Sequence, residues 1–499
     1  MSIVVLQFIS FLPTKISHST YLSYISSFFS DPQAFEEFSR CIHIPLSKAI
    51  TLVGSRSDPH YTIDQLREYG YTATPSPYQP SNYTVHLADQ WENNHTKSIP
   101  LWSTPWHLLW LFYIQETAAS IPASIIQIPS DWLILDMCAA PGGKTIQLAD
   151  RCMISWSSAL VWANEPDRKR GKVLRDNLVR CGITNTILTH HDGGRFGEHM
   201  PEVFDCILLD APCSGEGTWF KSTWWTKYRD IRKVQQIAKV QWSLLDSAFK
   251  ACKPWWQIVY STCTTNPIEN EHTLIKLLET YPGMVSIEEI AIDGLSDWLD
   301  DKSLSKNHAK DIQYCKRLRP HIHRTGWFFL VKIRKTWSLP TIKKNTLWVN
   351  RPINNHLELI DTASVVKWFH EHRWLSVWPE LTSLVFIQQW EFIYGCHPQC
   401  SAYLWIYQID QCGIPLIKWT KPSDRRPLHT SWVLFKWWDD HQILLDDNQI
   451  LQHLSQQDIT IEVEREKESW YYQLIWRDQQ VGIGKLVGDT IKNKYIALS

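Results

Sequence analysis

Two cysteines follow neighbouring predicted strands and are the residues best suited to covalent chemistry. One lies in Asp-Ala-Pro-Cys213-Ser-Gly and the other in Ser-Thr-Cys263-Thr. A thiolate is a strong nucleophile, and its addition to carbon 6 of a cytosine makes carbon 5 able to attack a methyl sulfonium. The carbon 5 proton must then leave before the thiol is eliminated, and a second cysteine can assist that step. Spacing alone does not say which cysteine attacks.

Asp210 stands directly before the Ala-Pro-Cys element. Its carboxylate is placed to hydrogen-bond the edge of such a base and to offset charge as the ring is attacked. Cys396 and Cys400 form a CxxxC without a second half-site, which is too weak a pattern for zinc, so no metal is predicted. Five other cysteines are expected to be small buried hydrophobes: Cys138, Cys152, Cys181, Cys206 and Cys252.

A loop of small residues follows the predicted strand that ends at Asp136. It reads Cys138-Ala139-Ala140-Pro141-Gly142-Gly143-Lys144 and leads into a helix. Small residues let a ligand approach the backbone, and a helix N-terminus offers free N–H groups. The loop matches neither a dinucleotide fingerprint nor a phosphate-binding P-loop.

Glu165 and Asp192 follow the next two predicted strands. Carboxylates at such strand ends can hold the hydroxyls of a ribose and the amino group of an adenine, although each one alone could equally cap a helix. Together with Asp136 they favour a cofactor that carries a nucleoside, and S-adenosylmethionine fits this layout.

The segment 131–335 must position these residues. Its short apolar runs alternate with amphipathic stretches, which is typical of βαβ units on a parallel sheet, where the carboxyl ends of the strands meet at one edge. The predicted strands are Trp132–Asp136, Leu160–Asn164, Thr186–Thr189, Cys206–Asp210, Gln257–Ser261 and Trp327–Ile333, and the predicted helices are Thr145–Cys152, Arg168–Arg180 and Val234–Cys252.

The flanking segments differ from this core in pattern. The first hundred residues are mixed, with a helix expected over 34–42 and a loop over 72–83. The predicted parts are an N-terminal RNA-binding extension over 1–100, a catalytic domain over 101–335, a linker over 336–350 and a β-rich region over 351–499.

Charge and hydropathy limit the partners. The 499 residues hold 50 Lys and Arg against 51 Asp and Glu, which excludes a uniformly basic surface, so an RNA site must be a local patch. The apolar run in the first 15 residues is too short to span a bilayer, and we expect a cytoplasmic protein without a membrane segment. The candidate basic patches are Arg168–Lys172 with Arg175, Lys316–Arg324, and Lys485 with Lys492 and Lys494.

The Cys138–Thr145 loop, Asp210–Gly215 and Ser261–Thr264, in this order, resemble the Sun-type RNA cytosine-5 methyltransferases. The similarity is good over residues 100–335, and Gly482–Tyr495 is similar to the RNA-binding domain of members that modify small-subunit ribosomal RNA. The resemblance implies an α/β fold: a Rossmann-like S-adenosylmethionine-dependent methyltransferase core, an N-terminal α/β extension and a C-terminal β-rich, PUA-like domain.

The resemblance also implies the role of each site residue. Cys263 is the expected nucleophile, and Cys213 is expected to serve product release. The implied substrate is a cytosine of 16S rRNA within the small ribosomal subunit, exposed by base flipping or local unpairing, with no obligate protein partner. The expected cofactor-site residues are Cys138, Ala139, Ala140, Pro141, Gly142, Gly143, Lys144, Glu165, Asp192 and Asp210.

Departures from the family pattern keep alternatives open. Pro254-Trp255-Trp256 stands where the family has Pro-Gly-Gly, and Trp at a turn that needs a positive φ is strained. With 28 Trp and 19 Gly in the chain, a weakly active or non-catalytic RNA-binding and ribosome-assembly factor that retains the fold is the main alternative. A DNA cytosine-5 methyltransferase would instead require Cys213 and dispense with Cys263.

Overall fold

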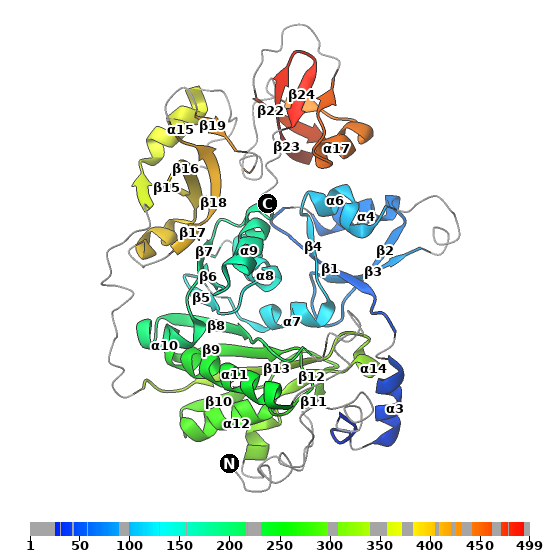
Figure 1. Cartoon of the computed structure of the whole chain (residues 1–499), viewed down its shortest axis with the longest axis vertical. Coiled ribbons are helices and arrows are strands. Elements are labelled where there is room, and N and C mark those ends of the chain that lie inside the picture. Colours follow the sequence, from blue (N-terminus) through cyan, green and yellow to red (C-terminus); the bar gives the residue numbers. More distant parts are fainter. Residues whose placement is uncertain are drawn as a thin grey trace.

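The computed structural model of the chain shows a central catalytic layer flanked by smaller sheets (Figure 1). The expected buried N-terminal run and Lys494 lie outside the described residues. The structure describes residues 25–29, 31–41, 44–56, 58–88, 99–128, 130–155, 157–215, 217, 231–297, 308–339, 357–371, 383–404, 409–420, 425–428, 430, 442–461, 471–477 and 479–493.

A ten-stranded sheet is the centre of the fold. Its strands are β5 (Leu133–Asp136), β6 (Leu160–Asn164), β7 (Thr186–Thr189), β8 (Phe204–Asp210), β9 (Cys252–Thr262), β10 (Val285–Glu288), β11 (Ser296–Asp297), β12 (Lys316–Leu318), β13 (Phe328–Lys335) and β17 (Ile409–Cys412). The order is β11-β12-β13-β9-β8-β5-β6-β7-β17, with β10 paired to β13. The run from β9 to β7 is parallel, and β13 and β17 are antiparallel to their neighbours in that run.

Helices cover both faces of this sheet, which explains why its central strands are apolar throughout. Side chains alternate between the faces: Leu135 and Ile207 belong to one core cluster, and Ile134 and Leu208 belong to another. The helices of this part are α7 (Thr117–Ile125), α8 (Gly143–Ile154), α9 (Arg168–Arg180), α10 (Phe196–His199), α11 (Ile231–Ala251), α12 (Glu271–Thr280), α13 (Ala309–Ile312) and α14 (Pro320–His323).

The predicted elements of the core are confirmed, and α9, β6 and β7 have the predicted bounds. The predicted loop over 72–83 is wrong at both ends. β2 (Tyr71–Pro75) pairs antiparallel with β3 (Asn82–Leu87), and only the residues between them form a turn. β2 is an edge strand, and an edge strand tolerates Pro75 because its solvent-facing side forms no ladder hydrogen bonds.

The N-terminal sheet has the order β2-β3-β1-β4 and so takes in a strand from beyond residue 100. The backbone N–H groups of Gly54 and Ser55 donate to the two carboxylate oxygens of Asp150 in α8, at 2.9 Å each. These bonds fix the N-terminal sheet against the catalytic layer. The further elements of this part are β1 (Lys48–Leu52), β4 (Phe112–Ile114), α3 (Pro32–Cys41), α4 (Pro59–Glu68) and α6 (Pro105–Leu108).

The C-terminal region contains two five-stranded sheets, as its β-rich pattern predicts. They follow the orders β14-β15-β16-β18-β19 and β20-β22-β23-β24-β21. Their strands are β14 (Leu357–Ile360), β15 (Val385–Gln389), β16 (Phe392–Cys396), β18 (Ile414–Lys418), β19 (Arg426–Pro427), β20 (Gln442–Leu444), β21 (Ile459–Thr460), β22 (Tyr471–Trp476), β23 (Gln479–Val487) and β24 (Thr490–Asn493), with α15 (Thr362–Glu371) and α17 (Asp447–Leu454). The PUA-like assignment of this region stays a prediction.

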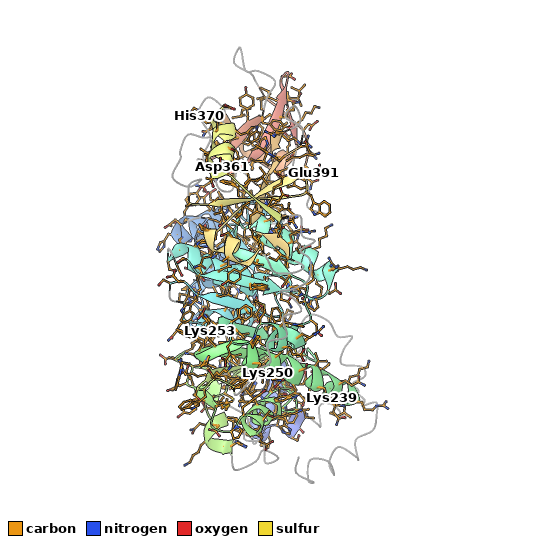
Figure 2. All side chains as sticks on the ribbon, turned by 90° about the vertical axis from the view of Figure 1, so that its left-hand side faces the viewer. Lys239, Lys250, Lys253, Asp361, His370 and Glu391 are labelled. Atoms are coloured by element: carbon orange, nitrogen blue, oxygen red, sulfur yellow. The ribbon has the colours of Figure 1, made fainter. Side chains whose placement is uncertain are left out.

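One strand of the C-terminal region leaves these sheets. β17 extends the catalytic sheet, where Ile409 pairs with Thr189 of β7. Figure 2 shows the two parts stacked along the long axis, with Lys239 labelled on the catalytic part and Glu391 on the C-terminal part. Among the described residues, no helix combines the length and hydrophobicity that a membrane crossing needs.

Trp255 has a φ of 70°, the backbone conformation that favours glycine, as the replaced Pro-Gly-Gly pattern predicts. Its side chain is 57% exposed and packs only against Trp337, with the ring centres 5.7 Å apart. Trp110 and Trp390 also have a positive φ, of 57° each. The positive φ expected at the turn after Pro254 is therefore present, and two tryptophans elsewhere in the chain share it.

Candidate active site

The site lies where the strand order of the sheet reverses. β6 and β7 lie on one side of β5, and β8 and β9 lie on the other, so Asp136 and Asp210 end neighbouring strands at the switch point. Ligands of open α/β sheets bind at this place. The ammonium group of Lys144 lies 2.7 Å from Oδ2 of Asp210 and so bridges the two strand ends.

Two side chains of α9 hold the loop after β5 by hydrogen bonds to its carbonyl groups. Nδ2 of Asn177 donates to the carbonyl of Pro141 at 2.8 Å, and Arg170 donates to the carbonyl of Ala140 at 2.9 Å. Gly142 has a φ of 115°, which other residues rarely adopt. A side chain at Gly143 would begin 3.0 Å from the ring of Tyr113. The start of α8 therefore packs closely against its neighbours and has little room for side chains at these two positions.

Asp136 is the buried acid of this loop. Its Oδ2 accepts a hydrogen bond of 2.7 Å from the hydroxyl of Thr145, while its buried Oδ1 has no hydrogen-bond partner among the described residues. Burial raises the pKa of Asp136 to about 6, against the lowering effects of Thr145 and Lys144. An unsatisfied buried acceptor at a switch point fits the ammonium group of an amino-acid-bearing cofactor.

Glu165 and Asp192 occupy the predicted strand ends but differ in environment. Glu165 is buried, and its Oε2 lies 3.2 Å from Arg170 while Oε1 accepts from the N–H of Asp167. Asp192 is exposed and caps a short turn by accepting from the N–H of Gly194 at 3.0 Å. The structure thus shows a cap at Asp192, the alternative that the sequence left open.

The two candidate cysteines are in contact. The Sγ atoms of Cys213 and Cys263 lie 3.1 Å apart, and both residues are partly buried. The hydrogen bond with Cys263, followed by burial, raises the pKa of Cys213 well above its usual value. The thiol of Cys213 is therefore held in its protonated form.

Asp210 is oriented by two donors beside these thiols. The hydroxyl of Ser261 donates to Oδ1 at 2.8 Å, and Lys144 pairs with Oδ2. Burial acts to lower the pKa of Lys144, but the charge of Asp210 and the hydrogen bond to it raise that pKa above its usual value, with smaller contributions from Asp136 and Cys263. The ammonium group therefore stays charged between the cofactor loop and the thiols.

Sequence reasoning missed the residues that hold the two cysteine loops. Glu269 is fully buried, and its Oε2 accepts from the N–H of Ser214 at 2.9 Å and from Nε2 of Gln241 at 3.0 Å. The hydroxyl of Thr264 donates to its Oε1 at 3.3 Å. The signal in the sequence is the polar triplet Glu269-Asn-Glu271, which stands just before the apolar face of α12.

Two cations of the basic cluster Lys316–Arg324 are engaged within the fold, and contact of the others with RNA stays a prediction. The guanidinium group of Arg317 is fully buried and pairs with both oxygens of Glu271, with a closest distance of 2.6 Å. Lys316 pairs with Asp297 at 2.7 Å. In the C-terminal patch, Lys492 pairs with Asp458 at 2.8 Å on the surface, where both side chains are exposed.

The expectation of small buried hydrophobes is confirmed for four of the five other cysteines and is wrong for Cys138. Cys396 and Cys400 are buried thiols, and the described residues contain no group of three or more ligand side chains suited to a metal ion. Cys138 is partly exposed, and burial of its thiol raises its pKa. Four others are fully buried, as expected of small hydrophobes: Cys152, Cys181, Cys206 and Cys252.

The chain is similar to known RNA methyltransferases. Residues 124–334 match the family model described as 16S rRNA methyltransferase RsmB/F. Ribosomal RNA small subunit methyltransferase F of Erwinia tasmaniensis is 29% identical over 475 residues, which are 93% of each chain. The protein of that name from Escherichia coli O81 is 36% identical over 311 residues, and the match spans 62% of this chain and 61% of that one.

Solved structures show the same fold. A methyltransferase homolog protein of Pyrococcus horikoshii is 28% identical with a TM-score of 0.52, over 60% of this chain and 90% of that one. NSun6 of the same organism, solved with SFG, has a TM-score of 0.54 at 20% identity, over 64% of this chain and 98% of that one.

Proposed function

Because residues 124–334 match the family model described as 16S rRNA methyltransferase RsmB/F, we propose that the chain methylates carbon 5 of a cytosine in 16S rRNA, with S-adenosylmethionine as the methyl donor. The relatives named ribosomal RNA small subunit methyltransferase F support small-subunit RNA as the substrate. The proposed setting is the cytoplasm, with the small ribosomal subunit as partner.

The contact between Cys213 and Cys263 carries the proposal, because no simpler methyl transfer needs two adjacent thiols. In the proposed reaction the Cys263 thiolate adds to carbon 6 of the cytosine, which makes carbon 5 nucleophilic. After methylation the carbon 5 proton leaves, the bond between Cys263 and carbon 6 breaks, and the double bond of the ring returns. Cys213, next to the leaving sulfur, assists this release.

Charged residues around the thiols support the same chemistry. Asp210, held by Ser261 and Lys144, accepts hydrogen bonds from the base edge and balances charge on the attacked ring. The cofactor supplies an electrophilic methyl group when bound. Asp136 and Glu165 would hold its ammonium and ribose groups, and the Gly142–Gly143 backbone would lie against it.

Methyl-labelled S-adenosylmethionine and small subunits that lack the modification test this proposal. We expect label in RNA with the wild type, no label with Cys263→Ala, and a covalent protein–RNA adduct on denaturing gels with Cys213→Ala. Absence of label with the folded wild type, in an assay validated with an active relative, would favour a non-catalytic RNA-binding factor. Loss of the first step with Cys213→Ala alone would favour the DNA-type mechanism.

A further inference from the structure

We infer that Glu269 is a positioning residue that keeps the two cysteine loops in register, so that the sulfur atoms of Cys213 and Cys263 remain in contact. For its role in turnover the inference rests on the proposed function, but the geometry behind it does not. Glu269 touches neither thiol in the described contacts and acts through the backbone and side chains that follow each cysteine.

The carboxylate of Glu269 binds both loops at once. Oε2 accepts from the N–H of Ser214, the residue after Cys213, and Oε1 accepts from the hydroxyl of Thr264, the residue after Cys263. The hydroxyl oxygens of Ser214 and Thr264 lie 2.9 Å from each other. One side chain therefore closes a ring of hydrogen bonds across the gap between the two strand ends.

A second set of bonds fixes the other side of the Cys213 loop. Nε2 of Gln241, in α11, donates both to Glu269 and to the carbonyl of Pro212, at 3.0 and 2.9 Å. The N–H of Gly217 donates to the carbonyl of Cys263 at 2.6 Å. A Cβ at Gly217 would lie only 2.3 Å from the carbonyl oxygen of Trp327, so a residue with a side chain does not fit at this close backbone approach.

The position of Glu269 is itself fixed by its neighbours. The hydroxyl of Tyr260 donates to the carbonyl of Glu269 at 2.6 Å, and Nδ2 of Asn270 donates to the carbonyl of Thr264 at 3.0 Å. Since Glu269 is fully buried, water cannot replace a lost acceptor for Ser214 or Gln241. The orientation of the loops thus depends on the acceptor oxygens at this residue.

Two substitutions at Glu269 separate the effect of its hydrogen-bond acceptors from the effect of its side-chain volume. Glu269→Gln keeps an acceptor at the Oε2 position, and the Thr264 hydroxyl can turn to accept from the new amide. Glu269→Leu keeps a similar size but removes both acceptors. Glu279→Gln, at the far end of α12 with a 57% exposed side chain, is the matched control.

The first measurement follows thiol contact without any substrate. In the full chain, diamide oxidises Cys213 and Cys263: two thiols lose two protons and two electrons to form a disulfide, and the diazene is reduced to a hydrazine. Alkylation and peptide mass spectrometry give the rate. We expect Glu279→Gln to react at the wild-type rate. Glu269→Gln and Glu269→Leu both lose the charge that raises the pKa of Cys213, so they are compared with each other. Glu269→Leu is expected to react about tenfold more slowly than Glu269→Gln, with cofactor binding retained. Equal rates in these two variants would overturn the inference.

The second measurement is turnover with labelled cofactor. Glu269→Leu is expected to lower kcat about tenfold while the Kd of the cofactor and the KM for RNA stay unchanged, and Glu269→Gln is expected to restore kcat. If the wild type transfers no methyl group but the cross-linking rates differ as expected, the proposed function fails and the positioning role stands.

If Glu269→Leu does not fold, Thr264→Val provides the same test. It removes the hydroxyl that contacts Glu269 and Ser214 and that accepts from the N–H of Asn266. A cross-linking rate about threefold lower is then expected, and an unchanged rate would overturn the inference.

Discussion

The ammonium group of Lys144 lies 2.7 Å from Oδ2 of Asp210 and joins the cofactor loop to the strand that leads to Cys213. The two residues come from either side of the switch point in the sheet. A single ion pair thus connects the proposed binding place of the methyl donor with that of the base.

Removal of this ion pair should affect chemistry more than folding. With Lys144→Met, Asp210 keeps Ser261 as a donor but loses its cation, so we expect methyl transfer to slow about a hundredfold. The melting temperature should change little because Asp210 is partly exposed. Lys239→Met, on the exposed face of α11, is the control and should retain wild-type turnover (Figure 2). Equal turnover of both variants would remove Lys144 from the mechanism.

Cofactor affinity should fall in mild acid because of Asp136. The carboxylate must be ionised to bind an ammonium group, and its pKa is about 6, so we expect the cofactor Kd to rise about tenfold per pH unit below that value. Titration calorimetry between pH 5 and pH 8 measures this. Asp136→Asn should weaken binding at pH 8 and abolish the pH dependence; a pH-independent wild type would contradict the assignment.

The carboxyl group of Asp136 should make the chain without cofactor more stable in mild acid, whereas it makes cofactor binding weaker there. The pKa of Asp136 is about 6 in the folded chain and 3.8 in the unfolded chain, so the folded chain binds this proton more tightly. The free energy of unfolding without ligand should therefore fall as the pH rises from 3.8 to about 6, and then level off. Urea unfolding at several pH values tests this. Asp136→Asn should be more stable than the wild type at pH 7, and equal stability there would argue against the raised pKa.

Removing one partner of the buried pair of Arg317 and Glu271 should destabilise the chain much more than replacing both. Arg317→Met leaves a buried carboxylate without its cation, and we expect a loss of about 3–5 kcal/mol in the free energy of unfolding. Urea denaturation gives this value. The double variant Arg317→Met with Glu271→Leu should recover most of the loss, and no recovery would show that Arg317 acts by another contact.

The two tryptophans after Pro254 should respond oppositely to glycine. Trp255 has a positive φ, so Trp255→Gly should stabilise the chain by about 1 kcal/mol. Trp256 packs against Trp132, with ring centres 4.3 Å apart, so Trp256→Gly should destabilise it by about 3 kcal/mol. Thermal unfolding of both variants compares them, and destabilisation by Trp255→Gly would show that its φ carries no strain.

Local signals in the sequence were enough to predict most of the catalytic layer. Short strands that end in Asp136, Asp210 and Cys263 must converge in a parallel sheet, so their residue types reveal both the elements and the edge that they share. The α9 helix was predicted with its observed bounds because its buried residues recur at helical spacing.

Features that depend on long-range pairing were not predictable in this way. β17 joins the sheet at β7 from the C-terminal region, and nothing in its own residues says which edge it extends. Arg317 looked like a surface cation because its buried partner Glu271 lies on another element. The positioning role of Glu269 was missed for the same reason, since its hydrogen-bond partners Ser214 and Gln241 belong to distant segments.

The positive φ angles of Trp110, Trp255 and Trp390 have a consequence at the level of the gene. The codon UGG for tryptophan differs in its first base alone from GGG for glycine, so each of these positions is one nucleotide away from the residue that its backbone favours. A translation system that reads UGA as glycine instead of tryptophan would remove the mismatch wherever that codon occurs. The codons at these three positions, and the masses of the peptides that span them, therefore report directly on how the message is decoded.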